Sequence, residues 1–340
     1  MIINGSHGEG GGQILRTAIA LSCITGKDIE IKDIRANRPN PGLAAQHLAG
    51  LQAAVRLTHA KTEGLRIGST SIKFSPGSVE GGFHAIDIGT AGAITLVLQT
   101  MAIPCLKAEE MTVFEITGGT DVPWSPSIAY FQHIFCDFMK KMSIDIGVEI
   151  LRYGFYPKGG GKVRVSLTPQ QKVKPLNFTE REKLEKKDIW SIASENLRNA
   201  RVAERQVEGA REFLKCDLKK SNVIYAPTLS PGSSVHIHAH FKNYKLGASS
   251  LGERGTPAEN VGGKAARLLK KQIDSEACLD EWMADQIIPY LALYGGKVSV
   301  SEITQHTKTN IWVCEQFGAK FTVEGDVVRV VSVIKNRERI

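Results

Sequence analysis

The sequence predicts an α/β protein whose larger part repeats one small unit three times. Its 340 residues exceed the usual limit of a single hydrophobic core, so two domains or a repeated architecture are expected. The order helix, strand, helix, strand, strand returns three times along the chain. A stretch with its own helices and strands separates the second copy from the third. The fold is therefore expected to be a large domain of three repeats with a smaller inserted α/β domain.

These elements set the expected boundaries. The large domain comprises residues 1–177 and 278–340, and the insert comprises residues 178–277. The three units are expected near residues 8–76, 88–167 and 284–333.

Apolar periodicity predicts the elements of the three units in order. In the first unit, helices are expected over 12–24 and 43–57, and strands over 28–34, 61–67 and 71–74. In the second unit, helices are expected over 91–101 and 127–142, and strands over 111–117, 145–151 and 161–167. In the third unit, helices are expected over 284–293 and 309–317, a strand over 297–302, and a hairpin over 320–324 and 326–333.

The insert follows a run of mixed charge, residues 179–187, which is interpreted as a solvated linker or helix face. Its predicted strands are 189–193, 222–225, 233–241 and 244–251, and its predicted helices are 199–214 and 257–273. The second helix has a strong start signal, with Thr256 as N-cap, Pro257 at the first position and Glu259 at the third.

Composition narrows the class of protein. The 43 Lys and Arg against 35 Asp and Glu give a net charge of +8, which favours an anionic partner such as a nucleic acid or nucleotide. The six cysteines are widely spaced and form no CxxC pair, which argues against a zinc site and a disulfide scaffold. No stretch has the length of a membrane span, and no secretory leader is evident. A cytoplasmic protein with no membrane partner is expected.

A glycine run leads directly into the first predicted helix. Gly8 through Gln13 contains a single acid, Glu9, and Arg16 follows inside the helix. Glycines allow close backbone approach, and the helix start offers unpaired N–H groups to an anion. Glu9 is a candidate ligand of a divalent cation. Arg16 could bind the anion that lies at the helix start. A turn that only tightens the loop-to-helix junction is the alternative.

Two further segments carry candidate phosphate-handling groups. Arg35 and Arg38 lie on a loop stiffened by two prolines, and Gln46 and His47 follow in the next helix. An exposed loop with local salt bridges fits the same residues. His306 lies in a polar segment between a predicted strand and a predicted helix, where an imidazole can act as base, metal ligand or nucleophile toward phosphorus. A surface histidine at a helix end is the alternative.

Two motifs remain ambiguous. The segment from Tyr153 to Lys162 joins aromatic residues to a second glycine run, which suits either stacking on a base or a hairpin turn. His236, His238 and His240 alternate along one strand and share a face. A partly exposed sheet face explains them better than a zinc site, because no Cys or carboxylate accompanies them.

Taken together, the motifs resemble the RNA 3′-terminal phosphate cyclase family along nearly the whole chain. The matching segments are His7–Arg16, Ile34–Pro39, Pro41–Leu43, Gln46–His47, Gly92–Gln99, Gly118–Asp121, Gly154–Pro157, Ala284–Gln286, and His306 with Thr309 and Asn310. The resemblance implies units of two helices and four strands, each similar to the C-terminal domain of a bacterial translation initiation factor. It also implies an ATP-dependent enzyme that converts an RNA 3′-phosphate to a 2′,3′-cyclic phosphate.

The resemblance assigns a role to each candidate residue. His306 would be the catalytic nucleophile that takes up AMP, and Glu9 would hold Mg²⁺ or Mn²⁺. The ATP site would comprise Arg16, Gln99, Pro126, Trp282, Asp285 and Gln286, with Trp282 or Pro126 stacked on adenine. The RNA phosphate would meet Arg35, Arg38, Gln46 and His47. The chain departs from some members at Thr307 and Lys308, which are often less polar, and at Trp282, where tyrosine is common. The insert carries none of these residues.

Two alternatives come from other classes. A cyclase-like ribosome-assembly factor shares the fold and binds without catalysis, but it lacks the nucleophile that His306 would provide. An enolpyruvyl transferase is built from similar units, but it has two comparable lobes and needs no reactive histidine at this place. The sequence leaves open whether the chain forms a homodimer and which metal it prefers.

Overall fold

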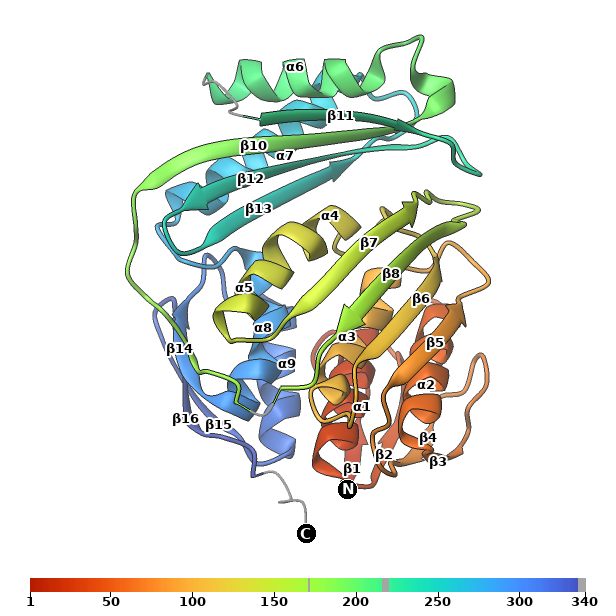
Figure 1. Cartoon of the computed structure of the whole chain (residues 1–340). Coiled ribbons are helices and arrows are strands. Elements are labelled where there is room, and N and C mark those ends of the chain that lie inside the picture. The colour runs from red at the N-terminus through yellow and green to blue at the C-terminus, as the bar shows by residue number, and fades with distance from the viewer. Residues whose placement is uncertain (171, 216–219, 336–340) are drawn as a thin grey trace.

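The structure is a computed structural model that describes residues 1–170, 172–215 and 220–335. Figure 1 shows how its helices and strands are arranged. The described strands form four sheets of four strands each. Three sheets belong to the repeated units, and the fourth belongs to the insert.

The first unit runs from residue 2 to residue 75. Its elements are β1 (Ile2–Asn4), α1 (Gly12–Thr25), β2 (Ile29–Lys32), α2 (Ala45–Thr58), β3 (Lys61–Glu63) and β4 (Ile72–Ser75). The sheet order is β1-β2-β4-β3, in which β1 and β2 are parallel and the other neighbours are antiparallel.

The second unit repeats this topology. Its elements are β5 (Gly82–Asp87), α3 (Ile94–Cys105), β6 (Thr112–Gly118), α4 (Ile128–Tyr130), the π-helical turn η1 (Phe131–Phe135), α5 (Cys136–Lys141), β7 (Ile146–Arg152) and β8 (Gly161–Leu167). The sheet order is β5-β6-β8-β7. The segment between β7 and β8, which includes Tyr153 to Gly160, is the connection of an antiparallel hairpin.

The third unit is divided along the chain. Its first strand is β9 (Leu176–Phe178), and the rest follows much later as α8 (Glu281–Tyr294), β14 (Gly296–Ser299), α9 (Gln305–Gln316), β15 (Lys320–Glu324) and β16 (Val327–Ser332). The sheet order is β9-β14-β16-β15, with β9 and β14 parallel. All three units therefore have the order β-α-β-α-β-β.

The helix and strand analysis of the sequence missed the first strand of every unit. β1 and β9 are only three residues long, so they show no hydrophobic period, and β5 exposes its largest apolar side chain, Phe83. These strands exist because each pairs in parallel with the strand after the first helix, a contact that no local pattern reveals.

The insert contains β10 (Leu184–Ser194), the 3₁₀ turn η2 (Glu195–Leu197), α6 (Val202–Leu214), β11 (Lys220–Ala226), β12 (Ser233–Phe241), β13 (Lys245–Leu251) and α7 (Ala258–Asp274). Its sheet order is β11-β10-β12-β13. Helices α6 and α7 pack on each other and cover one face of the sheet. The other face lies against α4 and η1 of the second unit.

Two local expectations for the insert were wrong. Leu184 to Lys187, predicted as linker or helix, form the start of β10, because they pair with the end of β12. The helix predicted from Pro257 begins at Ala258, so Pro257 and not Thr256 is its N-cap. The carbonyl of Pro257 accepts the N–H groups of Asn260 and Val261, which leaves Thr256 outside the helix.

The helices of the repeated units gather at the centre of the molecule. Helix α1 packs against both α3 and α9, while α2 packs against α3 and α8 against α9. The three sheets lie outside them (Figure 1). This arrangement brings the starts of helices from all three units together, although they are far apart in sequence.

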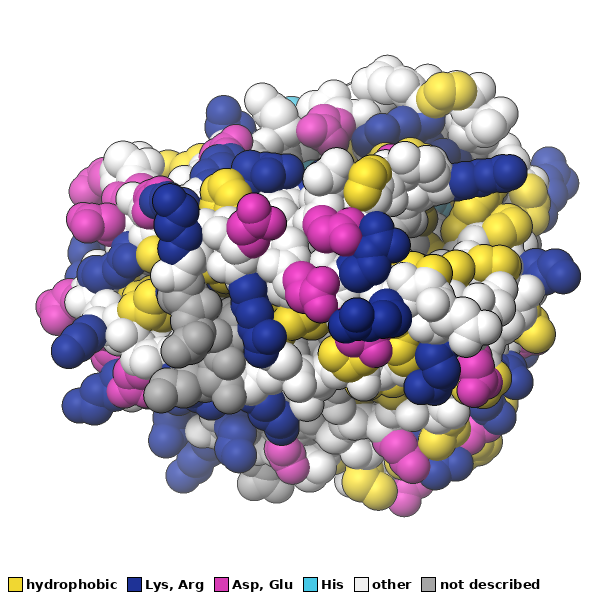
Figure 2. All heavy atoms as spheres, turned by 90° about the horizontal axis from the view of Figure 1, so that it is seen from above, with side chains coloured by type: hydrophobic (Ala, Val, Ile, Leu, Met, Phe, Trp, Pro, Cys, Tyr) yellow, Lys and Arg dark blue, Asp and Glu magenta, His cyan; other side chains and the backbone are white. Residues whose placement is uncertain are grey.

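The surface shows mixed charge. On the face seen in Figure 2, Lys and Arg side chains are interspersed with Asp and Glu and form no single basic patch. No helix in the described part of the chain is long and apolar enough to cross a membrane. The described cysteines, Cys23, Cys105, Cys136, Cys278 and Cys314, are free thiols, and Cys216 lies outside the described residues.

Candidate active site

A cavity of about 650 Å³ opens where the three units and the insert meet. It is lined by Glu9, Gly11, Gly12, Gln13, Arg16, Arg35, Arg38, Gln46, His47, Leu96, Gln99, Trp124, Ser125, Pro126, Ser127, Tyr130, Ser249, Trp282, Asp285 and His306. Every residue assigned from the sequence is therefore in its wall except Gln286. Gln286 lines a smaller neighbouring cavity, which shares Gln13, Arg16, Gln99 and Asp285 with the large one.

The glycine run brings α1 close to the start of α2. Gly8 and Gly10 have φ angles of +58° and +56°, which side chains rarely adopt. A Cβ on Gly12 would lie 2.0 Å from Nε2 of His47, so only glycine allows the imidazole to lie against the first turn of α1. None of the described side chains caps this helix, so its first N–H groups are available to a ligand.

His306 lies in the first turn of α9. The sequence analysis had placed it in a loop before this helix, which was wrong. Helix α9 begins at Gln305 because Thr304 caps it, its hydroxyl accepting the N–H of Thr307 at 3.1 Å. The side-chain amide of Gln13 donates to the carbonyl of His306 at 3.0 Å. The imidazole itself is half exposed, and its Nε2 lies 3.5 Å from Oε2 of Glu9.

The surroundings favour a neutral His306. Loss of solvation lowers the pKa of its imidazole below the usual value, Glu9 opposes this shift, and the positive charges of Arg16 and Arg38 reinforce it. A neutral imidazole retains the lone pair that a nucleophile or metal ligand needs.

Three arginines surround the same space. Arg38 lies 3.6 Å from the carboxylate of Glu9, and Arg35 donates to the carbonyl of Gly42 at 2.8 Å. Burial lowers the pKa of Arg16 to about 10, although Asp285 opposes the shift, so its guanidinium stays charged at neutral pH. Burial also lowers the pKa of Arg35, and Arg38 adds to that effect. The cluster holds more positive charge than the nearby carboxylates balance, which suits a phosphate ligand.

His47 and Gln46 present neutral donors beside these arginines. Burial, with Arg16 and Arg35, lowers the pKa of His47 to about 3, so it is uncharged. Its Nδ1 accepts the N–H of Ala44 at 3.2 Å, which leaves the proton on Nε2. Gln46 accepts the N–H of Ala93 through its oxygen at 3.3 Å and keeps its amide hydrogens for a ligand.

Asp285 connects helices of the first and third units. Gln13 donates to its carboxyl group at 3.4 Å, and Asn310 donates to its backbone carbonyl at 2.6 Å. Asn310 in turn accepts the hydroxyl of Thr17 at 2.7 Å. Loss of solvation raises the pKa of Asp285 to about 7; Arg16 opposes this shift and Asp280 adds to it.

Gln286 lies behind the wall of the large cavity. It accepts the amide of Gln99 at 3.1 Å and donates to the carbonyl of Trp282 at 2.7 Å. Gln286 therefore contacts two residues of the cavity wall, Gln99 and Trp282.

An apolar wall faces the charged groups. Pro126 and Trp282 both line the cavity, and the ring of Tyr130 meets that of Trp282 edge-on at 6.4 Å. Trp124 also lines it and is 98% exposed, with φ of +60°, a rare conformation for a bulky residue. This geometry displays an aromatic face to solvent at the mouth of the cavity.

One carboxylate, Glu9, could help to bind a divalent cation here. Among the described residues, no three His, Cys, Asp or Glu side chains stand close enough together to hold a metal ion. Mg²⁺ commonly uses one or two carboxylates with substrate phosphates and water. Glu9 fits a cation that arrives with a phosphorylated ligand.

The insert contributes to the site, contrary to the expectation from the sequence. Ser249 of β13 lines the cavity. Of the β12 histidines, His236 and His238 are buried, because the sheet packs on α4 and η1, whereas His240 is partly exposed as expected. His236 contacts Ser127 and Asp121, while the ring of His238 lies 5.2 Å from that of His133. His240 lies 3.0 Å from the carboxylate of Asp188.

Sequence reasoning missed several residues of the cavity wall. Gln13 was part of the glycine motif but had no role assigned to it, and its position after the run was the available signal. Trp124 and Ser127 lie on either side of Pro126, which the family resemblance did identify. Ser249 had no signal, since only the packing of β13 on α4 brings it to the site.

An α/β fold with a histidine of lowered pKa, three arginines and an apolar wall in one cavity is suited to binding a phosphorylated nucleotide. A family model described as RNA 3′-terminal phosphate cyclase matches residues 7–323. The chain therefore belongs to the RNA 3′-terminal phosphate cyclase family.

Individual relatives agree with the family match. An RNA 3′-terminal phosphate cyclase from Pyrococcus furiosus is 46% identical over 342 residues, which cover 97% of this chain and 98% of the relative. The cyclase from Thermococcus kodakarensis is 46% identical over 96% of this chain and 95% of its own. That from Archaeoglobus fulgidus is 44% identical over 94% and 95%. These matches support an enzyme of this family over the two alternative classes.

Proposed function

We propose that this chain uses ATP to convert an RNA 3′-phosphate to a 2′,3′-cyclic phosphate through a covalent adduct of AMP with His306. The observation that carries the proposal is the meeting of His306, Glu9 and Arg38 in one cavity, with an imidazole whose pKa is lowered. The family membership supports the class of reaction, and the residues of the cavity support the individual steps.

In the first step, a ring nitrogen of His306 forms a bond to the α-phosphorus of ATP. The bond to the bridging oxygen breaks, and pyrophosphate leaves with its electron pair. Arg16 and Arg38 offset the charge that develops on the phosphates, and Glu9 would hold the Mg²⁺ or Mn²⁺ that neutralises the triphosphate.

In the second step, an oxygen of the RNA 3′-phosphate attacks the phosphorus of the adduct and displaces His306. The product is an anhydride of RNA and AMP. The neighbouring 2′-hydroxyl then attacks the 3′-phosphorus, loses its proton, and displaces AMP, which closes the cyclic phosphate. Arg35 and the neutral donors of Gln46 and His47 would hold the RNA phosphate in position for both attacks.

We further propose that Trp282 and Pro126 hold the adenine and that Trp124 offers its exposed face to a base of the RNA. Base stacking on an aromatic ring is independent of sequence, as an end-processing enzyme requires. The position of Trp124 at the cavity mouth and its 98% exposure support this role.

At the level of the fold, we propose that each β-α-β-α-β-β unit is similar to the C-terminal domain of a bacterial translation initiation factor. We also propose that residues 178–277, apart from Phe178 at the end of β9, are a domain inserted in the third unit. The position of β9 before this segment and of α8 after it supports the insertion.

Incubation with α-labelled ATP tests the proposal. The wild-type chain should retain labelled AMP in a bond that is labile to acid and stable to alkali, as a phosphoramidate is. His306→Asn should abolish labelling with little change in melting temperature. His59→Asn, an exposed histidine paired with Glu80, is the matched control and should label normally. Retention of label by His306→Asn, or none by the wild type, contradicts the proposal, and the latter favours the non-catalytic binding factor.

A further inference from the structure

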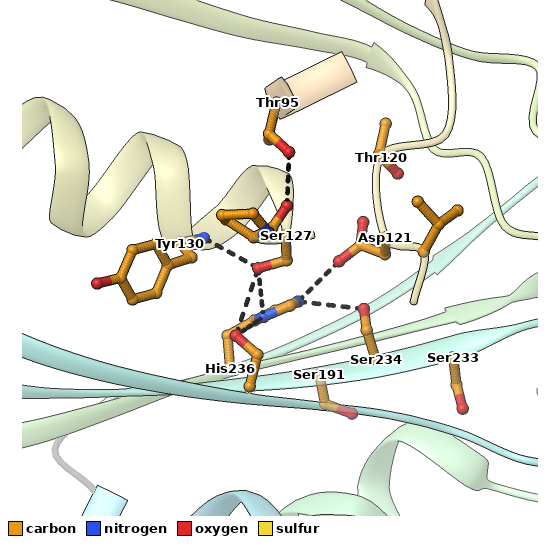
Figure 3. Close-up of polar contacts among 12 residues, drawn as sticks. Thr95, Thr120, Asp121, Ser127, Tyr130, Ser191, Ser233, Ser234 and His236 are labelled. Atoms are coloured by element: carbon orange, nitrogen blue, oxygen red, sulfur yellow. Dashed lines mark hydrogen bonds and ion pairs between the residues drawn. The ribbon is translucent and has the colours of Figure 1, made fainter. Parts of the chain in front are cut away.

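Two hydroxyl groups meet in the cavity wall at the boundary between the insert and the second unit. Ser127 is the N-cap of α4, and Ser249 lies on β13. Their Oγ atoms lie 3.4 Å apart, and each is 2.9 Å from Nδ1 of His236. Figure 3 shows His236 between Ser127 and Asp121. Both serines line the large cavity, whereas His236 is completely buried.

The hydroxyl hydrogens of Ser127 and Ser249 cannot both be accepted by Nδ1 of His236. Ser127 already accepts the N–H of Tyr130 at 3.1 Å, and each serine has one hydroxyl hydrogen to donate. If Nδ1 of His236 is unprotonated, it accepts one hydroxyl hydrogen and leaves the other. If Nδ1 carries a proton, it donates to one serine and both hydroxyl hydrogens remain. At least one O–H is therefore unused by His236 in every protonation state.

The other contacts of His236 cannot take up this hydrogen. Its Nε2 faces Ser234 at 3.1 Å and the Asp121 carboxylate at 3.0 Å, and neither of these residues lines the cavity. Among the residues that the structure describes, the only acceptor left for this hydrogen is the second serine, at 3.4 Å. That distance is well beyond the usual 2.7 to 2.8 Å of an O–H to oxygen bond, so the contact is weak and easily exchanged.

We infer that Ser127 and Ser249 form a hydrogen-bond donor site for an acceptor atom of the nucleoside bound in the cavity. The site is next to Pro126, the residue before Ser127, so a ring nitrogen of the base or an oxygen of the ribose is the chemistry it fits. This inference rests on the proposed function, since it presumes that the ligand is ATP. His236 acts as a positioning residue, because it holds the two hydroxyls without entering the cavity, and Asp121 contacts the opposite side of its imidazole.

The test measures ATP binding and covalent labelling separately. Ser249→Ala keeps the N-cap of α4, and Ser127→Ala combined with Ser249→Ala removes both donors. We expect the dissociation constant of ATP to rise three- to tenfold in the double variant, with the maximal rate of labelling little changed, as for loss of one neutral hydrogen bond. Ser234→Ala is the matched control, because it touches the same imidazole outside the cavity and should bind ATP normally.

Analogues locate the acceptor. The analogues tested are 1-deaza-ATP, 3-deaza-ATP, 7-deaza-ATP, 2′-deoxy-ATP and 3′-deoxy-ATP, each of which lacks one acceptor atom. One of them should bind the wild type three- to tenfold more weakly than ATP does. The double variant should bind that analogue no more weakly than it binds ATP. If the double variant folds and binds ATP with unchanged affinity, the inference is wrong. If the double variant does not fold, unchanged ATP affinity in Ser249→Ala overturns the inference instead. If the wild type binds ATP but takes up no label, the proposed function is contradicted. The comparison of ATP dissociation constants still tests the donor site in that case.

Discussion

The side-chain amide of Gln13 donates a hydrogen bond to the main-chain carbonyl of His306 at 3.0 Å. This bond joins the first turn of α1 in the first unit to the first turn of α9 in the third. It fixes the backbone that carries the proposed nucleophile without touching the imidazole.

We predict that Gln13→Met, which keeps the volume and removes the donor, slows labelling of His306 roughly tenfold or more, because small displacements of a reacting group are costly in rate. The dissociation constant of ATP should change less. Single-turnover labelling and equilibrium binding measure the two effects. Equal losses in rate and affinity would show that Gln13 binds the nucleotide directly.

Asp280 links α8 to the second unit and the insert. Its carboxylate accepts the hydroxyl of Tyr130 at 2.5 Å, the N–H of Gly247 at 2.9 Å and the N–H of Met283 at 2.8 Å. Asp280→Asn offers only one acceptor oxygen, so at least one of these buried donors would face an amide group. We predict a loss of about 2 kcal/mol in the free energy of unfolding. Denaturant unfolding measures it, and a neutral outcome would mean that the side chain can reorient.

Asp285 should make stability depend on pH in a definite direction. Burial raises its pKa to about 7 in the folded state, well above the usual value near 4. The folded chain therefore holds this proton between about pH 4 and 7 while the unfolded chain releases it, so the group lowers stability as pH rises through that window. Asp285→Asn cannot ionise. We therefore compare the melting temperatures of Asp285→Asn and the wild type at pH 5 and pH 8. The difference, variant minus wild type, should be larger at pH 8. A difference that does not change with pH would contradict this prediction.

The sequence predicted those parts of the fold that depend on local patterns. The amphipathic helices and the closing hairpin of β15 and β16 were found because their periods are long enough to read. Strands β1 and β9 were not found, since three residues give no period and their partners lie elsewhere. The start of α9 was misplaced because the cap at Thr304 was not recognised, and this put His306 in a loop.

The cavity wall divides in the same way. Glu9, Arg16 and His306 have reactive side chains in recognisable motifs, so sequence reasoning reached them. Ser249 and Gln13 act through hydrogen bonds that join residues far apart in the chain, and their chemical types are too common to stand out. Their roles depend on the packing of β13 on α4 and of α1 on α9.

Glu9 offers a test of metal involvement. We predict that Glu9→Gln, which removes the charge and keeps the size, lowers the labelling rate most at limiting Mg²⁺ and that excess Mn²⁺ partly restores it. Glu80→Gln, a surface carboxylate paired with His59, is the control. Titration of metal against labelling rate decides the matter, and an unchanged metal dependence would leave Glu9 as a partner of Arg38 and His306 only.

Trp124 should affect RNA and not ATP. We predict that Trp124→Ala raises the KM for a 3′-phosphorylated oligonucleotide about tenfold, in line with the loss of one stacked base, and that Trp124→Phe retains most of the affinity. An oligonucleotide with an abasic site at the stacked position should bind both proteins alike. Because the side chain is 98% exposed, the melting temperature should hardly change. A rise in the dissociation constant of ATP would instead place Trp124 on the adenine.

The insert provides the last prediction. The sequence alone suggested that its removal would spare the chemical centre, since none of the assigned residues lie in it. The structure gives three contacts against that view. Ser249 lines the cavity, the N–H of Gly247 is bonded to Asp280, and His236 holds Ser127.

Replacing residues 180–276 by a short Gly/Ser linker would also uncover the face of α4 and η1 on which β13 packs, including the fully buried Ile134. We therefore expect the deletion variant to aggregate or bind the dye ANS, and its soluble fraction to bind ATP more weakly than the full chain. Soluble yield, dye fluorescence and equilibrium ATP binding measure these effects. A monomeric variant that labels His306 at the wild-type rate would show that the insert serves the RNA alone. In that case the contacts of β12 and β13 with the second unit would stabilise the fold without shaping the nucleotide site.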